Sequence, residues 1–312
     1  MSSELQIIER LRALATHPAA RGLQDDAAVL DGLVLTHDTI AEGIHYLPTD
    51  PPASVGWKLV AVNLSDLAAK GARPAGALLS LTLAGEDSWT EAFLSGVAAA
   101  CESYGLPLLG GDTISLPGGA PRVLGLTAIG RAGPSVPARG GGKPGDRLWL
   151  IGTLGDAAAG LALLRINPKT NGPLVDVYHR PIPQLAAGQA LAPHATAMMD
   201  VSDGLLLDLT RLCAASNCGA EVDLDALPLS QAFIAGRGDD RTARLFAATG
   251  GDDYALLAAL PAELDPSATL SLPEATRLTC IGVLAPGRNL SLTDRGGAVP
   301  LPEHLGHEHR PF

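Results

Sequence analysis

The strongest hydrophobic pattern in the chain lies between residues 56 and 71, where a segment without proline is apolar almost all the way round a helix. This pattern predicts a helix over residues 54–70 that is buried on every side. Gly71 stands where a left-handed C-cap belongs, and Pro74 prevents the helix from continuing. Three polar residues follow one another at helical spacing: Asn63, Asp66 and Lys70. A buried carboxylate is costly unless it is paired or binds a cation, so Asp66 needs either a salt bridge or capping hydrogen bonds, or a bound cation.

The rest of the pattern divides into two halves that mix strands and helices. The first half predicts helices over 1–16 and 88–104, and strands near 24–30, 33–36, 77–83, 106–109 and 123–130. The second half predicts strands near 147–151, 198–200, 219–224, 254–260, 278–284 and 289–293, and helices near 154–165, 182–192 and 203–216. Residues 131–146 are rich in Gly and Pro, which is typical of a connection between domains. Because strands and helices do not alternate strictly, we expect an α+β fold with two domains, residues 1–137 and 138–312.

Composition narrows the class of protein. The 312 residues are 46% hydrophobic, which suits two domains with substantial cores. The net charge of −11 argues against nonspecific binding to nucleic acid or anionic membranes. The N-terminus lacks the apolar segment of a signal peptide, and no apolar run reaches the roughly 18 residues of a membrane span. Four scattered cysteines are expected to be buried thiols, so we predict a cytoplasmic protein without nucleic-acid or membrane partners.

The acidic residues carry the clearest chemical signal, because 22 of them are Asp and only 11 are Glu. Most of the informative ones lie beside glycines or at predicted strand ends: Asp25, Asp26, Asp38, Asp112, Asp200, Asp203, Asp252 and Asp253. Each one alone is compatible with a turn or a helix cap. Together with Asp66 they would converge where loops meet, and converging carboxylates need cations. Oxygen ligands indicate Mg²⁺ or Ca²⁺, and several such ions indicate phosphoryl transfer from a nucleotide.

Other candidate motifs add less. Residues 140–145 match the glycine spacing of a dinucleotide fingerprint, but they precede a predicted strand instead of following one. Pro144 also rules out a phosphate-binding loop at Gly142-Lys143. His45 could contact a substrate or be an ordinary loop residue. Residues 304–309 contain three histidines, for which a mobile polar tail is the simpler interpretation than a metal site.

Seven segments together resemble one enzyme family. They are residues 25–29, 36–45, 63–72, 110–113, 139–146, 200–205 and 250–254, which span nearly the whole chain. By these segments the sequence resembles the thiamine-monophosphate kinases of the aminoimidazole-ribonucleotide-synthetase-like superfamily. The resemblance implies direct phosphoryl transfer from ATP to thiamine monophosphate, with several Mg²⁺ ions and no phosphoenzyme. It also implies a homodimer whose N-terminal sheets pair into a barrel, with the active site in a cleft between the domains.

The resemblance further assigns roles to single residues. The metal-binding positions of the family match Asp26, Thr36, Asp38, Asp66, Asp112, Asp200 and Asp203. The nucleotide-binding positions match Gly111, Asp112, Arg139 and Ser202, and the positions that bind thiamine monophosphate match His45, Asp252 and His307. Asp66, Asp112 and Asp203 are expected to matter most. No general base is expected, because a phosphate monoester acceptor is already ionised near neutral pH.

Four positions depart from the family pattern: His37, Asp252, Ala255 and His307. His37 stands where Thr or Ser usually lies beside a metal, and His307 stands where an aromatic ring usually stacks. These changes bear on substrate affinity more than on the metal cluster. Two alternative functions stay open. One is another ATP-using member of the superfamily, such as a purine cyclo-ligase-like enzyme, and the other is a non-catalytic protein that binds divalent cations.

Overall fold

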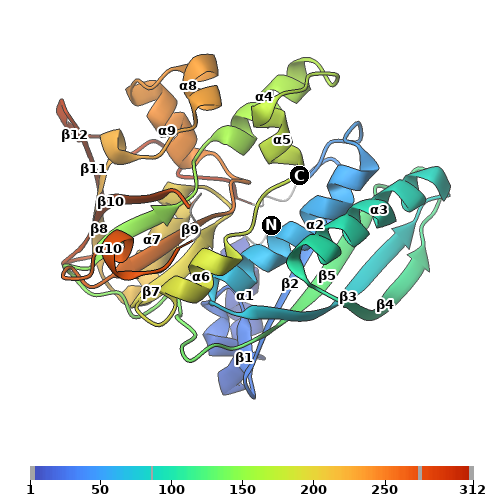
Figure 1. Cartoon of the computed structure of the whole chain (residues 1–312), viewed down its shortest axis with the longest axis horizontal. Coiled ribbons are helices and arrows are strands. Elements are labelled where there is room, and N and C mark those ends of the chain that lie inside the picture. Colours follow the sequence, from blue (N-terminus) through green and yellow to red (C-terminus); the bar gives the residue numbers. More distant parts are fainter. Residues whose placement is uncertain (1–3, 86, 273–275, 309–312) are drawn as a thin grey trace.

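The computed structural model describes residues 4–85, 87–272 and 276–308, which form two sheets with their own helices (Figure 1). The N-terminal sheet has the strand order β1-β2-β5-β3-β4. Its strands are β1 (Ala28–Leu30), β2 (Leu33–Ala41), β3 (Arg73–Leu83), β4 (Leu108–Ser115) and β5 (Val123–Arg131), and they follow helix α1 (Glu4–Arg12) and the 3₁₀ segment η1 (Pro18–Leu23). Strands β3 and β4 run parallel, because a helix connects them, and the other neighbours are antiparallel.

One face of this sheet is covered by helices α2 (Pro52–Ala69) and α3 (Asp87–Tyr104), which lie side by side (Figure 1). Two glycines allow the close approach of these helices. A Cβ at Gly56 would lie 2.2 Å from the carbonyl oxygen of Phe93, and a Cβ at Gly96 would lie 1.9 Å from that of Ala53. Any larger residue at either position would force the helices apart.

Helix α2 also packs against the C-terminal half, which explains why it is apolar on every side. A Cβ at Gly188 of helix α6 (Leu185–Leu191) would lie 2.1 Å from the carbonyl oxygen of Ala68. Ala69 packs in a hydrophobic cluster that otherwise belongs to the C-terminal half. The predicted helix over 54–70 is therefore confirmed, and it lies between the two halves of the molecule.

The C-terminal sheet has the strand order β12-β11-β8-β10-β6-β9-β7. Its strands are β6 (Arg147–Ile151), β7 (Ala197–Val201), β8 (Gly219–Asp223), β9 (Ala255–Leu260), β10 (Leu278–Ala285), β11 (Leu290–Asp294) and β12 (Gly297–Val299). The helices of this half, besides α6, are α4 (Asp156–Ile166), α5 (Pro173–His179), α7 (Leu205–Ser216), η2 (Leu224–Ala226), α8 (Gln231–Arg237), α9 (Arg241–Thr249) and α10 (Pro266–Thr269). Strand β9 is buried throughout, which its six apolar residues allow.

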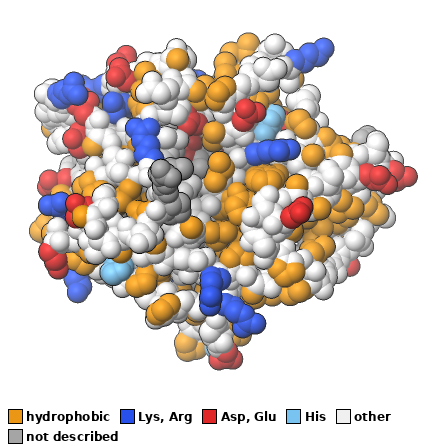
Figure 2. Space-filling view, viewed as in Figure 1, with side chains coloured by type: hydrophobic (Ala, Val, Ile, Leu, Met, Phe, Trp, Pro, Cys, Tyr) orange, Lys and Arg blue, Asp and Glu red, His pale blue; other side chains and the backbone are white. Residues whose placement is uncertain are grey.

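The outer face of the N-terminal sheet, opposite α2 and α3, carries exposed apolar side chains. All residues of edge strand β4 are exposed, including Leu108 and Ile114. Leu78 of β3 and Val123 of β5 are exposed as well. Figure 2, drawn from the helix side, shows further hydrophobic side chains gathered over the N-terminal half. An exposed edge strand with apolar residues is a surface that proteins normally cover.

The structure confirms the α+β class and two mixed halves, with some shifted boundaries. Strand β2 continues past the predicted end at residue 36, so Asp38 lies within a strand. Strand β4 includes the Gly-Gly-Asp-Thr segment that was expected to follow a strand over 106–109. Within the described residues the N-terminal sheet does not close on itself, and its pairing into a barrel across a dimer stays a prediction. No helix in the described ranges is both long and apolar enough to cross a lipid bilayer.

Candidate functional site

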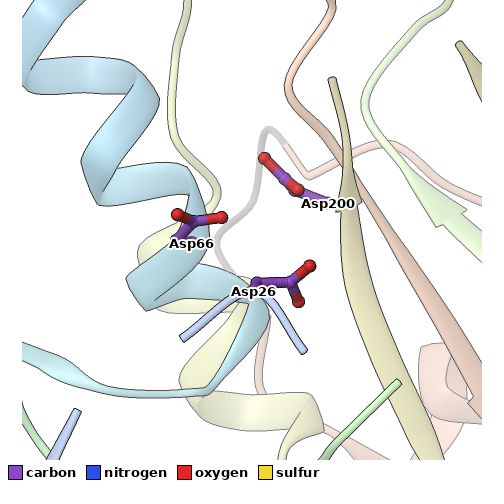
Figure 3. A group of neighbouring side chains, drawn as sticks. All are labelled: Asp26, Asp66 and Asp200. Atoms are coloured by element: carbon purple, nitrogen blue, oxygen red, sulfur yellow. The ribbon is translucent and has the colours of Figure 1, made fainter. Parts of the chain in front are cut away.

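Three carboxylates from three separate elements meet between the two halves of the molecule. Asp26 precedes β1, Asp66 lies on α2 and Asp200 lies on β7. One oxygen atom from each carboxylate lies within 4.8 Å of the others. Figure 3 shows the three side chains around one space beside the helix and the strand. The predicted convergence of these acids is therefore observed.

Burial and mutual repulsion make two of these carboxylates hard to ionise. Burial raises the pKa of Asp66 well above its usual range, and the charges of Asp38, Asp200 and Asp26 raise it further. Burial, with the charge of Asp26, raises the pKa of Asp200 to about 8. Thr36 donates a hydrogen bond to Oδ2 of Asp66, and this bond opposes the rise only in part. The pair would release its protons readily only if positive charge entered the space between them.

Asp26 behaves in the opposite way because two fixed cations face it. Burial would raise its pKa, but Lys70 and Arg139 outweigh burial and lower it. Lys70 Nζ lies 2.7 Å from Oδ2 of Asp26, and Arg139 Nε donates to Oδ1 at 2.6 Å. Lys70 also pairs with Asp25 and donates to the carbonyl of Met198 at 3.0 Å. The polar residues predicted to line one side of α2 therefore do not act together. Lys70 pairs with Asp25 and Asp26, and no cation among the described residues forms an ion pair with Asp66.

Asp38 and Asn63 extend the acidic site along β2. Side chains alternate along this strand, so Thr36 and Asp38 face α2 while His37 and Thr39 face outward. Asn63 Oδ1 accepts a hydrogen bond from the backbone N–H of Asp38 at 3.0 Å, which ties the strand to the helix. Burial raises the pKa of Asp38 to about 6, and the charges of Asp26 and Asp203 contribute to the rise.

His37 has a different place from the one its sequence position suggested. Its Nδ1 lies 2.9 Å from Oγ1 of Thr127 and its Nε2 lies 3.2 Å from Oγ1 of Thr39, on the outer face of the sheet. The imidazole of His37 therefore faces away from the acid cluster, and a metal contact by the backbone at this position stays a prediction. The acid cluster lies on the other side of the sheet.

The turn between β7 and α7 carries Ser202 and Asp203, and its conformation depends on Asp208. Oδ2 of Asp208 accepts hydrogen bonds from the backbone N–H groups of Ser202, Asp203 and Gly204 at 3.1, 3.0 and 3.2 Å. Arg211 joins the two acids, since its Nη1 lies 2.6 Å from Oδ2 of Asp203 and 2.8 Å from Oδ1 of Asp208. The sequence analysis allowed a turn or a helix cap at Asp203 and did not identify Asp208. Its signal was an acid in the first turn after a glycine.

The residues predicted on the acceptor side lie in three segments that approach one another. Nδ1 of His45 accepts a hydrogen bond from the backbone N–H of Ala41 at 3.0 Å. Oδ2 of Asp252 lies 2.6 Å from Nζ of Lys58, and Lys58 also donates to the carbonyl of His45 at 3.2 Å. The backbone N–H of His307 donates to the carbonyl of Asp203 at 2.8 Å, which brings the C-terminal segment to the same region. Lys58 was not predicted as a site residue. The signal was available, because Lys58, like Asp66, is a charged residue in a helix that is otherwise almost entirely apolar.

Asp253 has a structural place beside Asp252. Its Oδ2 accepts from the backbone N–H of Gly155 at 2.7 Å and its Oδ1 accepts from that of Ala157 at 3.3 Å. It therefore caps helix α4 from a distant loop. Burial raises the pKa of Asp253 well above its usual range. The two neighbouring acids of the Gly-Gly-Asp-Asp segment thus have different partners. Asp252 pairs with Lys58, and Asp253 caps helix α4.

Asp112 and Gly111 are not brought to the acid cluster of their own chain. Along the sheet, Thr39 of β2 pairs with Gly125, Gly125 pairs with Ser80, and Ser80 pairs with Asp112 of β4. Paired residues point to the same side, so Asp112 shares the exposed outer side of Thr39 and Ser80. Three strand spacings of about 4.8 Å also separate it from β2 by roughly 14 Å.

Comparison with known proteins places these features in a family. Residues 24–132 match the N-terminal domain of AIR synthase related proteins, and residues 143–295 match the C-terminal domain. The thiamine-monophosphate kinase of Salmonella typhimurium is 41% identical over 281 residues, which cover 85% of this chain and 84% of that protein. The solved structure of AaThiL complexed with AMPPCP and TMP superposes with a TM-score of 0.84 at 30% identity, covering 98% of this chain and 97% of the other. The crystal structure of thiamine-monophosphate kinase from Stenotrophomonas maltophilia K279a has a TM-score of 0.75 at 37% identity, covering 95% and 96%.

Proposed function

Because the chain belongs to the thiamine-monophosphate kinase family of AIR synthase related proteins, we propose that it transfers the terminal phosphoryl group of ATP to thiamine monophosphate. The products are thiamine diphosphate and ADP. The observation that carries the proposal is the convergence of Asp26, Asp66 and Asp200, in a chain that shares 41% identity with a kinase of this name. A cluster of carboxylates that repel one another is suited to a reaction between two phosphorylated substrates that share metal ions.

The residues of the cluster fit Mg²⁺. All of their donor atoms are oxygens, and burial together with the neighbouring carboxylates raises the pKa values of Asp66 and Asp200, so a cation between them would be stabilising. We propose that Asp26, Thr36, Asp38, Asp66, Asp200 and Asp203 hold several Mg²⁺ ions. Bound Mg²⁺ supplies the positive charge that offsets repulsion between ATP and the acceptor phosphate.

Two segments of the protein are proposed to position the nucleotide. One is the connection between the domains, and the other is the β7–α7 turn. Arg139 has a guanidinium that is partly exposed and faces the acids, so it can reach an incoming phosphate. Ser202 lies in a turn whose backbone N–H groups are oriented by Asp208. With these groups fixed, the reaction depends on alignment and charge, and no side chain needs to remove a proton from the acceptor.

The acceptor is proposed to bind on the side of His45, Asp252 and His307. These residues come from the loop after β2, the loop before β9 and the C-terminal segment. Backbone hydrogen bonds bring the loop before β9 and the C-terminal segment to the β7–α7 turn, since Asp252 donates to Ser202 at 2.7 Å and His307 donates to Asp203. The proposed acceptor and nucleotide sites are therefore adjacent.

A homodimer would cover the outer face of the N-terminal sheet. That face carries Leu78, Ile114 and Val123, all between 42% and 53% exposed. It also carries Asp112, which the register keeps away from the acid cluster of its own chain. We propose that two copies pair these sheets into a barrel, and that Gly111 and Asp112 contribute to nucleotide binding in the dimer. We also propose a cytoplasmic location. The four cysteines are free thiols, which is consistent with a reducing compartment.

An acceptor panel tests the proposed function. Purified protein with ATP and Mg²⁺ should release ADP with thiamine monophosphate, and not with thiamine or a phosphorylated aminoimidazole precursor. Release that requires the aminoimidazole precursor would instead indicate a cyclo-ligase-like enzyme. Binding of an ATP analogue with no acceptor-dependent release would indicate a non-catalytic cation-binding protein.

A further inference from the structure

Lys58 is a buried cation outside the acid cluster, and the reaction proposed above does not use it. It lies on α2, about two turns before Asp66, and is 2% exposed. Its ammonium has three neighbours. These are Oδ2 of Asp252 at 2.6 Å, the carbonyl of His45 at 3.2 Å and the ring of Tyr178, whose centroid is 4.0 Å away.

These neighbours come from three segments that are far apart in the chain. His45 belongs to the loop after β2, Tyr178 to helix α5 and Asp252 to the loop before β9. The first segment lies in the N-terminal half and the other two in the C-terminal half. Lys58 thus joins both halves at the edge of the proposed acceptor site.

The backbone of the loop that holds Asp252 is fixed by contacts other than the one with Lys58. Asp252 and Tyr254 adopt left-handed backbone conformations, with φ values of 71° and 51°. The backbone N–H of Asp252 donates to Ser202 at 2.7 Å, and that of Tyr254 donates to Val201 at 2.9 Å. Tyr254 also donates from its hydroxyl to Oδ1 of Asp252 at 3.1 Å. The backbone is fixed to the β7–α7 turn, while Lys58 and Tyr254 fix the direction of the carboxylate.

A second set of hydrogen bonds, centred on Asp50, holds Tyr178 beneath the ammonium of Lys58. Oδ2 of Asp50 accepts from the Tyr178 hydroxyl at 2.9 Å and from the backbone N–H of Leu47 at 2.8 Å. Nε2 of His179 lies 3.2 Å from Oδ1 of the same Asp50. Helix α5 is therefore attached to the loop that carries His45. The aromatic ring beneath Lys58 cannot shift without breaking these contacts.

We infer that Lys58 is a positioning residue for the acceptor substrate, an inference that rests on the proposed function. It acts by fixing the carboxylate of Asp252 relative to the loop of His45. The Lys58 side chain is only 3% exposed and its ammonium is surrounded by protein groups, so it does not touch the acceptor itself. The Asp252 side chain is 27% exposed and keeps surface available for a ligand. Loss of the ammonium would let the carboxylate of Asp252 turn, while the loop backbone, the acid cluster and Arg139 stay in place.

Steady-state kinetics of Lys58→Met, with Lys58→Arg and the exposed Lys169→Met as comparisons, test the inference. We expect Lys58→Met to raise KM for thiamine monophosphate about tenfold, with kcat changed less than about threefold. The Kd of a nonhydrolysable ATP analogue should stay within about twofold of the wild-type value, because its contacts are untouched. Lys58→Arg should recover part of the loss, and Lys169→Met should behave as wild type. In an Asp252→Ala background, Lys58→Met should change KM less than about twofold, because both changes remove the same contact.

Two results would overturn the inference while leaving the proposed function intact. One is a wild-type KM in Lys58→Met. The other is an equal loss of acceptor and ATP-analogue affinity together with a lower Tm, which would indicate a purely structural role. If Lys58→Met does not fold, Lys58→Gln gives the same readout with a donor retained. Absence of acceptor turnover in the wild-type protein would overturn the proposed function, and this inference with it.

Discussion

Ser65 of α2 donates a hydrogen bond from Oγ to Oδ2 of Asp200 on β7 at 2.7 Å. This bond joins the helix that carries Asp66 to the strand that carries the third acid of the cluster. Because both residues are buried, the bond is shielded from water and fixes the position of Asp200. The geometry of the cluster therefore depends on contacts between the two halves of the chain.

Removing this hydrogen bond should weaken metal binding without unfolding the protein. In Ser65→Ala the carboxylate of Asp200 loses a donor that favours its ionised form, so Mg²⁺ affinity should fall about tenfold. Isothermal titration calorimetry of the wild type and the variant with Mg²⁺ measures the change in affinity. The exposed Ser95→Ala on α3 is the matched control and should bind Mg²⁺ as the wild type does. An affinity equal to wild type in Ser65→Ala would show that the bond does not position Asp200.

Stabilisation by Mg²⁺ should increase as the pH rises from about 5 to 8. The folded-state pKa values of Asp38 and Asp200 are raised from 3.8 to about 6 and about 8, and that of Asp66 is raised as well. The metal-free native state therefore binds more protons than the unfolded state, and these groups lower stability as pH rises through this window. Mg²⁺ needs the ionised carboxylates and should restore the loss. Tm measured with and without Mg²⁺ at several pH values tests this, and a Mg²⁺-induced shift that is independent of pH would contradict it.

Lys70→Met should destabilise the fold strongly. Lys70 is fully buried, and its loss leaves the buried carboxylates of Asp25 and Asp26 with fewer cations. Removing one partner of a buried ion pair typically costs about 3–5 kcal/mol. Urea unfolding of the variant measures the free energy of unfolding. Arg241→Met, which breaks an ion pair with Asp294 at the surface, is the matched control and should leave the free energy of unfolding close to the wild-type value.

Ile114→Lys should prevent the proposed dimer. Ile114 is 53% exposed on the outer face of β4, and a charge there cannot be buried between two sheets without a partner. Sedimentation should show a dimer for the wild type and a monomer for the variant. Ile166→Lys, which adds the same charge at an exposed residue of α4, should leave the oligomeric state unchanged. A monomeric wild type would exclude the dimer.

The sequence alone predicted those parts of the fold that depend on local pattern. The apolar surface of α2, its end near Gly71 and the presence of Asp66 in a buried helix all follow from residues close together in the chain. The place of Asp112 did not follow, because it depends on which side of a sheet faces outward and on the register of three strand pairs. The pairing of Lys70 with Asp25 also spans 45 residues, and nothing local distinguishes it from a pair with Asp66. The task of Lys58 became visible only when distant loops were placed around it. Asp208 differs, because its hydrogen-bond partners lie close to it in the sequence.

Direct transfer from ATP to thiamine monophosphate is the reaction that the acid cluster is proposed to serve. Single-turnover reactions with γ-³²P-labelled ATP test it by following the label into thiamine diphosphate. Wild-type protein should place the label on the terminal phosphate of thiamine diphosphate in a Mg²⁺-dependent reaction. Asp66→Asn should be folded yet at least about 100-fold slower, while the exposed Asp239→Asn should match the wild type. Label that stays in ATP or appears only as inorganic phosphate in the wild type, or an Asp66→Asn variant as fast as the wild type, would contradict the claim.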